Sequence, residues 1–421
     1  MTMHAYNSTI LFAGPLVLDL FDGLVIGTDG FVYGQHDLFS GTTDGQHNIF
    51  IAGTAATSTW AFLLGDFGHE MIGSTITLTA TGVVRGFVGV DYIGAGLELG
   101  NAGTISGDLA AIRLEGGSAS VGNLLVNSGT IIGGQAIDAF ASTLSATTII
   151  NSGLIRGTLG TAISLAGTDT DDAVVNSGRI IGHVELGGGE DSYDGRGGEV
   201  MGTVRGGDGN DRFRPGAGED SFDGGSGSDL LDFRTGDGAV ELALDGSWDS
   251  TGWAEGDTYT GFERVIGTTQ ADRIGGNSAA NILNGGAGAD QLFGQAGADT
   301  LIGGGGIDIL SGGAGNDSFQ FNRLAECGDL LADFSSAAAG NNDRFLISAD
   351  FGGGLAAGSL AAGLFVSRAD NLAQDGNDRF IFRTADRTLW FDADGTGTGA
   401  GVLVASLQAG ATMTAADIVI F

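Results

Sequence analysis

Acidic residues recur at nine-residue intervals between Gly267 and Phe321, a spacing that could assemble a row of cation sites. Read in nines, the stretch gives GTTQADRIG, GNSAANILN, GGAGADQLF, GQAGADTLI, GGGGIDILS and GGAGNDSFQ. The sixth place of these lines holds Asp272, Asn281, Asp290, Asp299, Asp308 and Asp317. Carboxylates and turn carbonyls are the hard oxygen ligands that Ca²⁺ takes. The pattern therefore predicts the binding of several calcium ions.

Each nine divides into a six-residue turn and a three-residue strand, which is typical of a parallel β-roll. The turn glycines let the backbone come close to an ion. The eighth place holds large apolar residues that would point inward, namely Ile274, Leu283, Leu292, Leu301, Leu310 and Phe319. Because two nines complete one coil, each ligand-position residue should lie over the one eighteen residues later. The predicted pairs are Asp272/Asp290, Asp290/Asp308, Asp299/Asp317 and the weaker Asn281/Asp299. A Gly-rich flexible linker would not keep these positions in phase.

An earlier block repeats the pattern in GGDGNDRFR, PGAGEDSFD and GGSGSDLLD. It places Asp211, Asp220 and Asp229 in phase as further candidate metal ligands. Upstream, GGGEDSYDG puts Asp191 in a similar turn but out of strict phase. Asp392 and Asp394 resemble the start of an EF-hand loop that lacks the Glu at the twelfth place.

A longer repeat precedes both blocks and predicts a right-handed parallel β-helix with coils of about 25 residues. Its lines are ATGVVRG, NAGTISG, NSGTIIG, NSGLIRG, NSGRIIG and VMGTVRG, the last beginning at Val200. We expect three short strands per coil, and a ladder at one corner made by Asn101, Asn127, Asn151 and Asn176. The arginines at 85, 156 and 205 recur at one place of the repeat and suggest a surface stripe.

We therefore expect an all-β protein in which the β-helix and the β-roll form one continuous solenoid with β-rich caps. Trp248 and Trp253 should cover the edge of the roll. The expected segments are an N-terminal cap or interaction domain (1–75), the β-helix (76–205), a first roll block (206–234), flanking strands (235–266), a second roll block (267–321) and a C-terminal cap (322–421).

The composition excludes several classes of partner. The net charge is −34, and all 17 basic residues are arginine, so the chain should repel nucleic acid and anionic membranes. No stretch approaches the roughly 20 apolar residues of a membrane-spanning helix. The single cysteine, Cys327, excludes an internal disulfide. Residues Ile10 to Leu18 are interpreted as a strand, because no basic segment precedes them as it would in a signal peptide.

The nines resemble the RTX (repeats-in-toxin) family of calcium-binding proteins. The segment GDTYTGFERVIGTTQADRI resembles the lead-in to such blocks in long alphaproteobacterial members, including surface and matrix proteins. The sequence LWFDADGTGTGAGVLVASL resembles the tail of serralysin-type and S-layer-type members. The resemblance implies type I secretion through an uncleaved C-terminal signal, folding driven by calcium outside the cell, and association with a cell surface.

No catalytic constellation is recognisable, so we expect no enzyme. A zinc protease would need H-E-x-x-H, but Gly73 stands where the second His after His69 and Glu70 belongs. The preferred interpretation is an extracellular protein that assembles with other copies of itself into a matrix fibre, surface layer or adhesin. The alternative is a β-helix protein that binds or modifies polysaccharide, as a lyase or epimerase does.

Overall fold

The computed structural model describes the chain except residues 1–2, 7–8, 13–15, 19–22, 35–38, 42–46, 65–70, 117–120, 140–144, 168 and 338–340. The described residues form β-strands and short 3₁₀ turns, with no α-helix among them. They divide into two compact units. Unit 1 comprises residues 1–229 and 257–261, and unit 2 comprises residues 230–256 and 262–421. The expected all-β class is confirmed. His69 and Glu70 lie outside the described residues.

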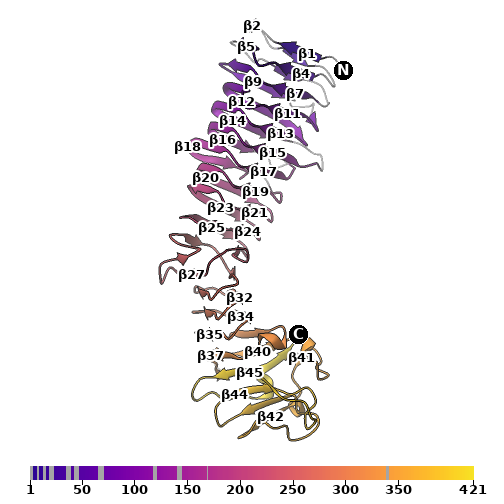
Figure 1. Cartoon of the computed structure of the whole chain (residues 1–421), viewed down its shortest axis with the longest axis vertical. Helices are drawn as coiled ribbons and strands as arrows, with labels where there is room; N and C mark the ends of the chain where they lie inside the picture. Colours follow the sequence, from indigo (N-terminus) through magenta and orange to yellow (C-terminus); the bar gives the residue numbers. More distant parts are fainter. Residues whose placement is uncertain are drawn as a thin grey trace. The chain divides into compact units, whose positions relative to one another are not determined.

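Unit 1 is a parallel β-helix whose coils stack along the chain (Figure 1). One sheet contains β11 (Thr75–Leu78), β13 (Glu98–Asn101), β15 (Asn123–Asn127), β17 (Thr147–Asn151) and β19 (Ala173–Asn176). The other contains β12 (Val83–Ala95), β14 (Thr104–Glu115), β16 (Thr130–Ala139), β18 (Leu154–Ser164) and β20 (Arg179–Gly188). Every neighbouring pair in these sheets is parallel. Inward aliphatic side chains such as Ile105, Ile131 and Ile155 are fully buried.

From β11 to β20 each coil holds two main strands where the sequence predicted three short ones, whereas the coil of β21 (Ser192–Asp194), β22 (Glu199–Met201) and β23 (Thr203–Asp208) keeps three. The second and third segments merge into one long strand that bends at a register shift, as between Gly86 and Val88. The same irregularity recurs between Gly107 and Ala110 in the next coil. A bulge bends a strand without ending its pairing, so the corner costs few hydrogen bonds.

Residues 1–75 contribute further coils of the same helix. In the first sheet, β1 (Met3–Tyr6), β4 (Gly23–Ile26) and β7 (Asn48–Ile51) pair in parallel and lead into β11. In the second sheet, β2 (Thr9–Phe12), β5 (Phe31–Gly34) and β8 (Thr54–Thr57) lead into β12. The segment Ile10 to Leu18, expected as a strand, includes part of β2 and all of β3 (Leu16–Leu18). In place of the expected cap or interaction domain, these strands belong to the helix itself.

The predicted asparagine ladder is confirmed. The side-chain amide of Asn101 donates to Asn127 Oδ1 at 2.8 Å, Asn127 donates to Asn151 at 2.7 Å, and Asn151 donates to Asn176 at 2.8 Å. All four side chains are buried. Each amide also forms a hydrogen bond with the backbone of its own turn. The ladder therefore provides hydrogen-bond partners for buried polar groups at this corner of the four coils.

The predicted arginine register is wrong for Arg205. Arg85 and Arg156 share one column through Ser106 and Ile132. Met201, not Arg205, occupies that column in the last coil. The repeat shortens after Asn176, so β22 (Glu199–Met201) pairs with the start of β20, while β23 (Thr203–Asp208) pairs with its end. The line beginning at Val200 was therefore aligned four residues out of phase.

Unit 1 ends within the first nonapeptide block, whose last strand, β26 (Leu230–Asp232), belongs to unit 2. The strands of unit 1 in and beside the block include β21 (Ser192–Asp194), β24 (Arg212–Arg214), β25 (Ser221–Ser226) and β29 (Thr258–Thr260). Aromatic rings replace the aliphatic core of the helix here. Tyr193, Phe213 and Phe222 lie 5.6–6.4 Å apart between ring centroids, and Phe222 stacks on Tyr259.

Unit 2 contains the second nonapeptide block as a two-sided parallel roll. One side consists of β26 (Leu230–Asp232), β30 (Arg264–Ile266), β32 (Ile282–Ala287), β34 (Thr300–Gly305) and β36 (Ser318–Phe321). The other consists of β27 (Val240–Ala243), β31 (Arg273–Gly275), β33 (Gln291–Phe293), β35 (Ile309–Ser311) and β37 (Asp329–Leu331). The apolar residues at the eighth place are fully buried between the sides, as predicted. Trp248 packs against Phe293 with 5.9 Å between ring centroids, and Arg273 lies over its ring.

Strands after Phe321 continue both sides of the roll and then reverse direction. The parallel pairs are β36 with β40 (Arg344–Ile347), β40 with β46 (Ile418–Ile420), and β37 with β45 (Val402–Leu407). The antiparallel strands β43 (Phe380–Arg383) and β44 (Thr388–Phe391) pair beside β45. Phe380, Phe391 and Phe351 pack together under them.

Candidate metal centre

Each ligand-position residue of the second block is hydrogen-bonded to the one a full coil later. The backbone N–H groups of Asp272 and Asp290 donate to Oδ1 of Asp290 and Asp308, both at 2.8 Å. On the other side of the roll, Asn281 donates to Asp299 at 2.7 Å and Asp299 to Asp317 at 2.9 Å. The four stacked pairs that the spacing predicted are therefore present, as two rows of aspartates, one of which includes Asn281.

The first block forms a similar row. Asp191 donates its backbone N–H to Asp211 Oδ1 at 2.8 Å, and Asp211 donates to Asp229 at 2.7 Å. Asp191 belongs to this row although it falls outside the nine-residue phase. The coil from Asp191 to Asp211 is twenty residues long, whereas the coil from Asp211 to Asp229 is eighteen. Asp220 lies on the opposite side of the roll, where its N–H donates to Asp257 Oδ1 at 2.8 Å.

Four aspartates that the sequence analysis missed extend these rows. Asp172 donates its backbone N–H to Asp191 Oδ1 at 2.7 Å, and Asp257 accepts from Asp220. At the other end, Asp308 donates to Asp329 and Asp317 to Asp343, both at 3.0 Å. Each of the four stands two residues before a buried apolar residue; these residues are Val174, Tyr259, Leu331 and Phe345. That Asp-x-apolar signal survives where the glycines and the nine-residue spacing are lost.

The second oxygen of most row aspartates is buried with no hydrogen-bond partner among the described residues. The atoms concerned are Oδ2 of Asp191, Asp211, Asp290, Asp299, Asp308, Asp317 and Asp329. These residues are at most 2% exposed. An ionised carboxylate oxygen in such a position is costly unless a cation or a donor reaches it. Seven such oxygens repeating along two blocks are the strongest sign of a cation site on this chain.

The first glycine of each nine is required because the carboxylate occupies the place of its side chain. A Cβ built on Gly303 would lie 2.4 Å from Asp308 Oδ2, and one on Gly285 would lie 2.3 Å from Asp290 Oδ2. The fourth-place glycines of the second block, Gly288, Gly297, Gly306 and Gly315, have positive φ, and their turns stack closely. A Cβ on Gly306 would lie 1.5 Å from the carbonyl oxygen of Gly288. Backbone carbonyls and carboxylates thus share the interior of each turn.

Burial raises the pKa of these carboxyl groups. It raises the pKa of Asp290 and Asp299 to about 7, against the lowering effect of the backbone N–H that each accepts and with neighbouring aspartates adding to the rise. The pKa of Asp191 and that of Asp329 are raised to about 8 by the same burial. Burial also raises the pKa of Asp211, Asp308 and Asp317. Without a cation, the rows hold their negative charge poorly at neutral pH.

A calcium ion in these turns would need backbone carbonyls as well as carboxylates as ligands. Among the described residues, no three Asp, Glu, His or Cys side chains gather as a metal-binding group. Ca²⁺ takes six to eight oxygen ligands and accepts backbone carbonyls readily, so an ion between two turns would take carboxylate Oδ2 atoms from the row and the remainder from turn carbonyls. A bound ion would supply the positive charge that the buried oxygens lack.

Two other sequence features are less suited to a metal. In the EF-hand-like loop, Asp392 Oδ1 accepts from the N–H groups of Asp394 and Gly395, and Asp394 Oδ2 accepts from Gly399. These bonds close the turn with the carboxylates themselves. Burial and neighbouring acidic groups raise the pKa of the Cys327 thiol to about 12, which keeps it protonated and a poor ligand.

Comparison with known proteins agrees with this geometry. Residues 202–238, 257–292 and 293–321 match the family model of the RTX calcium-binding nonapeptide repeat (4 copies). No curated protein matches the chain. None of the helices in the described part of the chain has the length and apolar character to cross a membrane. The chain therefore carries RTX calcium-binding nonapeptide repeats over these residues, as the sequence predicted.

The contact between first-place glycine and carboxylate gives a test within one turn. Gly303→Ala should weaken calcium binding at least about tenfold, because the new Cβ displaces the Asp308 carboxylate. Gly305→Ala is the matched control, since a Cβ there meets only Ala287 Cβ at 3.9 Å. Calcium titration calorimetry of both variants measures the difference. Equal affinities in the two variants would contradict the placement of the carboxylate.

The raised pKa values predict an unusual pH dependence for the calcium-free protein. Aspartates with an ordinary pKa of about 4 when unfolded and about 7 when folded bind more protons in the folded state. The free energy of unfolding should therefore fall as pH rises from about 4 to about 8. In saturating calcium the order should reverse, because protons compete with the ion. Urea unfolding at pH 5 and pH 8, in EDTA and in calcium, measures both trends, and a calcium-free protein that is more stable at pH 8 would contradict them.

Proposed function

We propose that this chain is a secreted calcium-binding structural protein whose copies assemble side by side outside the cell. In this proposal the metal ligands include Asp191, Asp211, Asp220, Asp229, Asp272, Asn281, Asp290, Asp299, Asp308 and Asp317, with Asp172, Asp257, Asp329 and Asp343 ending the rows. RTX repeats are typical of proteins exported by type I systems. Calcium would then complete the fold where the ion is plentiful.

The observation that carries the assembly is an uncharged column on the outside of unit 1. We call it the uncharged face. It consists of one outward residue from each of eight consecutive parallel strands: Ala5, Val25, Phe50, Thr77, Gly100, Val126, Ile150 and Val175. At ~4.8 Å per strand it runs for about 34 Å. Phe50, Val126, Ile150 and Val175 are each about 40% exposed.

The neighbouring outward column is nearly as free of charge. From β7 to β19 it holds Asn48, Thr75, Glu98, Leu124, Thr148 and Ala173, of which only Glu98 is charged. Leu124 is also 37% exposed. Together the two columns make a surface on which five half-exposed apolar side chains stand among mostly neutral residues. Surfaces of this kind mark sites of association in soluble proteins.

A second copy of the same chain is the partner that the charge distribution favours. Two molecules with a net charge of −34 repel one another over most of their surfaces. The uncharged face is a region where identical chains can approach without juxtaposing carboxylates. Calcium would act twice, by completing the rolls and by lowering the net charge that opposes association.

A charge placed in the centre of the uncharged face should prevent assembly without preventing folding. Ile150→Glu exposes its new side chain on an outward position, so calcium binding should remain. Its sedimentation coefficient in millimolar calcium should be that of a monomer, whereas the unaltered chain should form large species that dissociate in EDTA. A carboxylate buried between two copies without a partner costs several kcal/mol, which is enough to abolish a weak lateral contact.

Leu159→Glu is the control for this experiment. Leu159 is 78% exposed on the bend of β18, so the same substitution is made away from the uncharged face. Assembly should be unchanged. The proposal is wrong if the unaltered chain stays monomeric in calcium, or if Leu159→Glu disrupts assembly as strongly as Ile150→Glu does.

A further inference from the structure

The opposite sheet of unit 1 carries a column of charged residues in register. Asp91, Arg113, Asp138, Ser164, Glu185, Arg205 and Asp223 occupy neighbouring places on β12, β14, β16, β18, β20, β23 and β25. Arg113 pairs with Glu115 at 3.0 Å, and Arg205 pairs with Glu185 at 2.5 Å. This surface differs in kind from the uncharged face and has no part in the proposed assembly.

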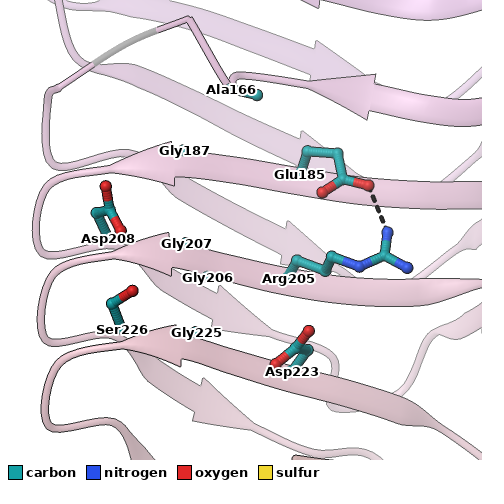
Figure 2. A pocket seen from close by; sticks show the side chains of 10 residues that line it. All are labelled: Ala166, Glu185, Gly187, Arg205, Gly206, Gly207, Asp208, Asp223, Gly225 and Ser226. Atoms are coloured by element: carbon teal, nitrogen blue, oxygen red, sulfur yellow. Dashed lines mark hydrogen bonds and ion pairs between the residues drawn. The ribbon is translucent and has the colours of Figure 1, made fainter. Parts of the chain in front are cut away.

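A cavity of about 370 Å³ lies at the end of this column. Figure 2 shows Glu185, Arg205 and Asp223 along one side and Asp208 and Ser226 along the other. Three glycines in register, at 187, 207 and 225, form the floor between them. Arg205 and Asp208 are three residues apart, so the two polar rows are about 10 Å apart at ~3.3 Å per residue. We call this cavity the trough.

The floor of the trough is kept free of side chains by the backbone. The three floor glycines have φ between +106° and +118°. A Cβ on Gly207 would lie 1.9 Å from the carbonyl oxygen of Gly187. No other residue fits these positions without strain. The trough is therefore a fixed feature of the coil geometry, open to solvent and ready to hold a flat ligand.

Some polar groups on the sides of the trough are held in place by an ion pair, and the others are available for hydrogen bonds to a ligand. The ion pair holds the Arg205 guanidinium beside the floor (Figure 2). The side-chain oxygens of Asp208, Asp223 and Ser226 make no hydrogen bond to any residue that the structure describes. They are therefore available to donors on a ligand, while Arg205 offers donors of its own.

The chemistry of the sides selects the class of ligand. Three carboxylates against one guanidinium disfavour an anion. The lining contains no aromatic or large aliphatic side chain, which disfavours an apolar ligand. Asp208 and Asp223 stand on opposite sides of the floor, too far apart to share a small cation. A ring that bears hydroxyl groups along both edges meets all three conditions.

We propose that the trough binds a neutral oligosaccharide whose chain lies along the column from Glu185 to Asp223. Hydroxyl groups on one edge would donate to Glu185 and Asp223 and accept from Arg205. Those on the other edge would bond Asp208 and Ser226. The site belongs to unit 1 alone, so it requires no second copy of the chain.

Binding of neutral gluco-, manno- and galacto-hexasaccharides to the immobilised, calcium-saturated full chain tests the proposal. Arg205→Ala should weaken binding of the preferred hexasaccharide at least about tenfold, because hydrogen bonds from a charged donor are lost. Arg179→Ala is the matched control. It breaks a surface ion pair to Glu199 at 3.1 Å outside the trough and should leave binding unchanged.

Three results would overturn the proposal. The first is no binding of any neutral hexasaccharide at millimolar concentration. The second is preference for a uronate hexasaccharide, which would show that an anion is the ligand. The third is equal weakening by Arg205→Ala and Arg179→Ala, which would place binding elsewhere. Calcium affinity measured on the same Arg205→Ala protein should be unchanged, and this separates loss of the sugar site from loss of the rolls.

Discussion

The structure depends on buried carboxylates of which only one oxygen is satisfied. Oδ1 of each row aspartate accepts a backbone N–H from the previous coil, as Asp308 does from Asp290, and this bond fixes the register of the stack. In seven of them Oδ2 is left inside the turn without a donor among the described residues. The same carboxylate thus aligns the coils and requires a positive charge, so the fold and the metal depend on each other.

The glycines of the turns make room for the buried carboxylates and also shape the outer surface of unit 1. The first glycine of a nine leaves room for the carboxylate, and the second turns the chain with positive φ. Where such turns follow the last coils of the helix, their second glycines also form the bare floor of the trough. Parallel stacking at a fixed strand spacing places equivalent residues in columns, so an uncharged column on one sheet and a charged column on the other can each present a repeating surface. One coil geometry therefore underlies the carboxylate rows and both of the surfaces on which the proposed assembly and the proposed ligand binding depend.

The sequence alone predicted the stacking correctly wherever the repeat was strict. The eighteen-residue stacking of Asp272 on Asp290, the buried eighth-place residues and the asparagine ladder all follow from period alone. It failed where coil length changes. Asp329 and Asp343 follow irregular loops, so neither has the spacing that would identify it, although both keep the Asp-x-apolar signal. Arg205 was assigned to the wrong column because the coil after Asn176 is shortened. The coils before residue 75 were missed because the number of residues per coil changes there, as the register of Met3, Gly23, Asn48 and Thr75 shows. Their glycines nevertheless stack at one corner, where Gly30, Gly53 and Gly82 are continued by Gly103 and Gly129.

The central claim is that the unsatisfied row oxygens bind calcium, and replacing one of them tests it directly. Asp290→Asn keeps the acceptor for the Asp272 N–H but removes the buried charge. The free energy of unfolding should rise relative to the unaltered chain in EDTA, where the carboxylate is only a cost, and fall in saturating calcium, where a ligand is lost. A change of the same sign in both conditions would contradict the account, because it would show that the carboxylate at 290 acts without regard to the ion.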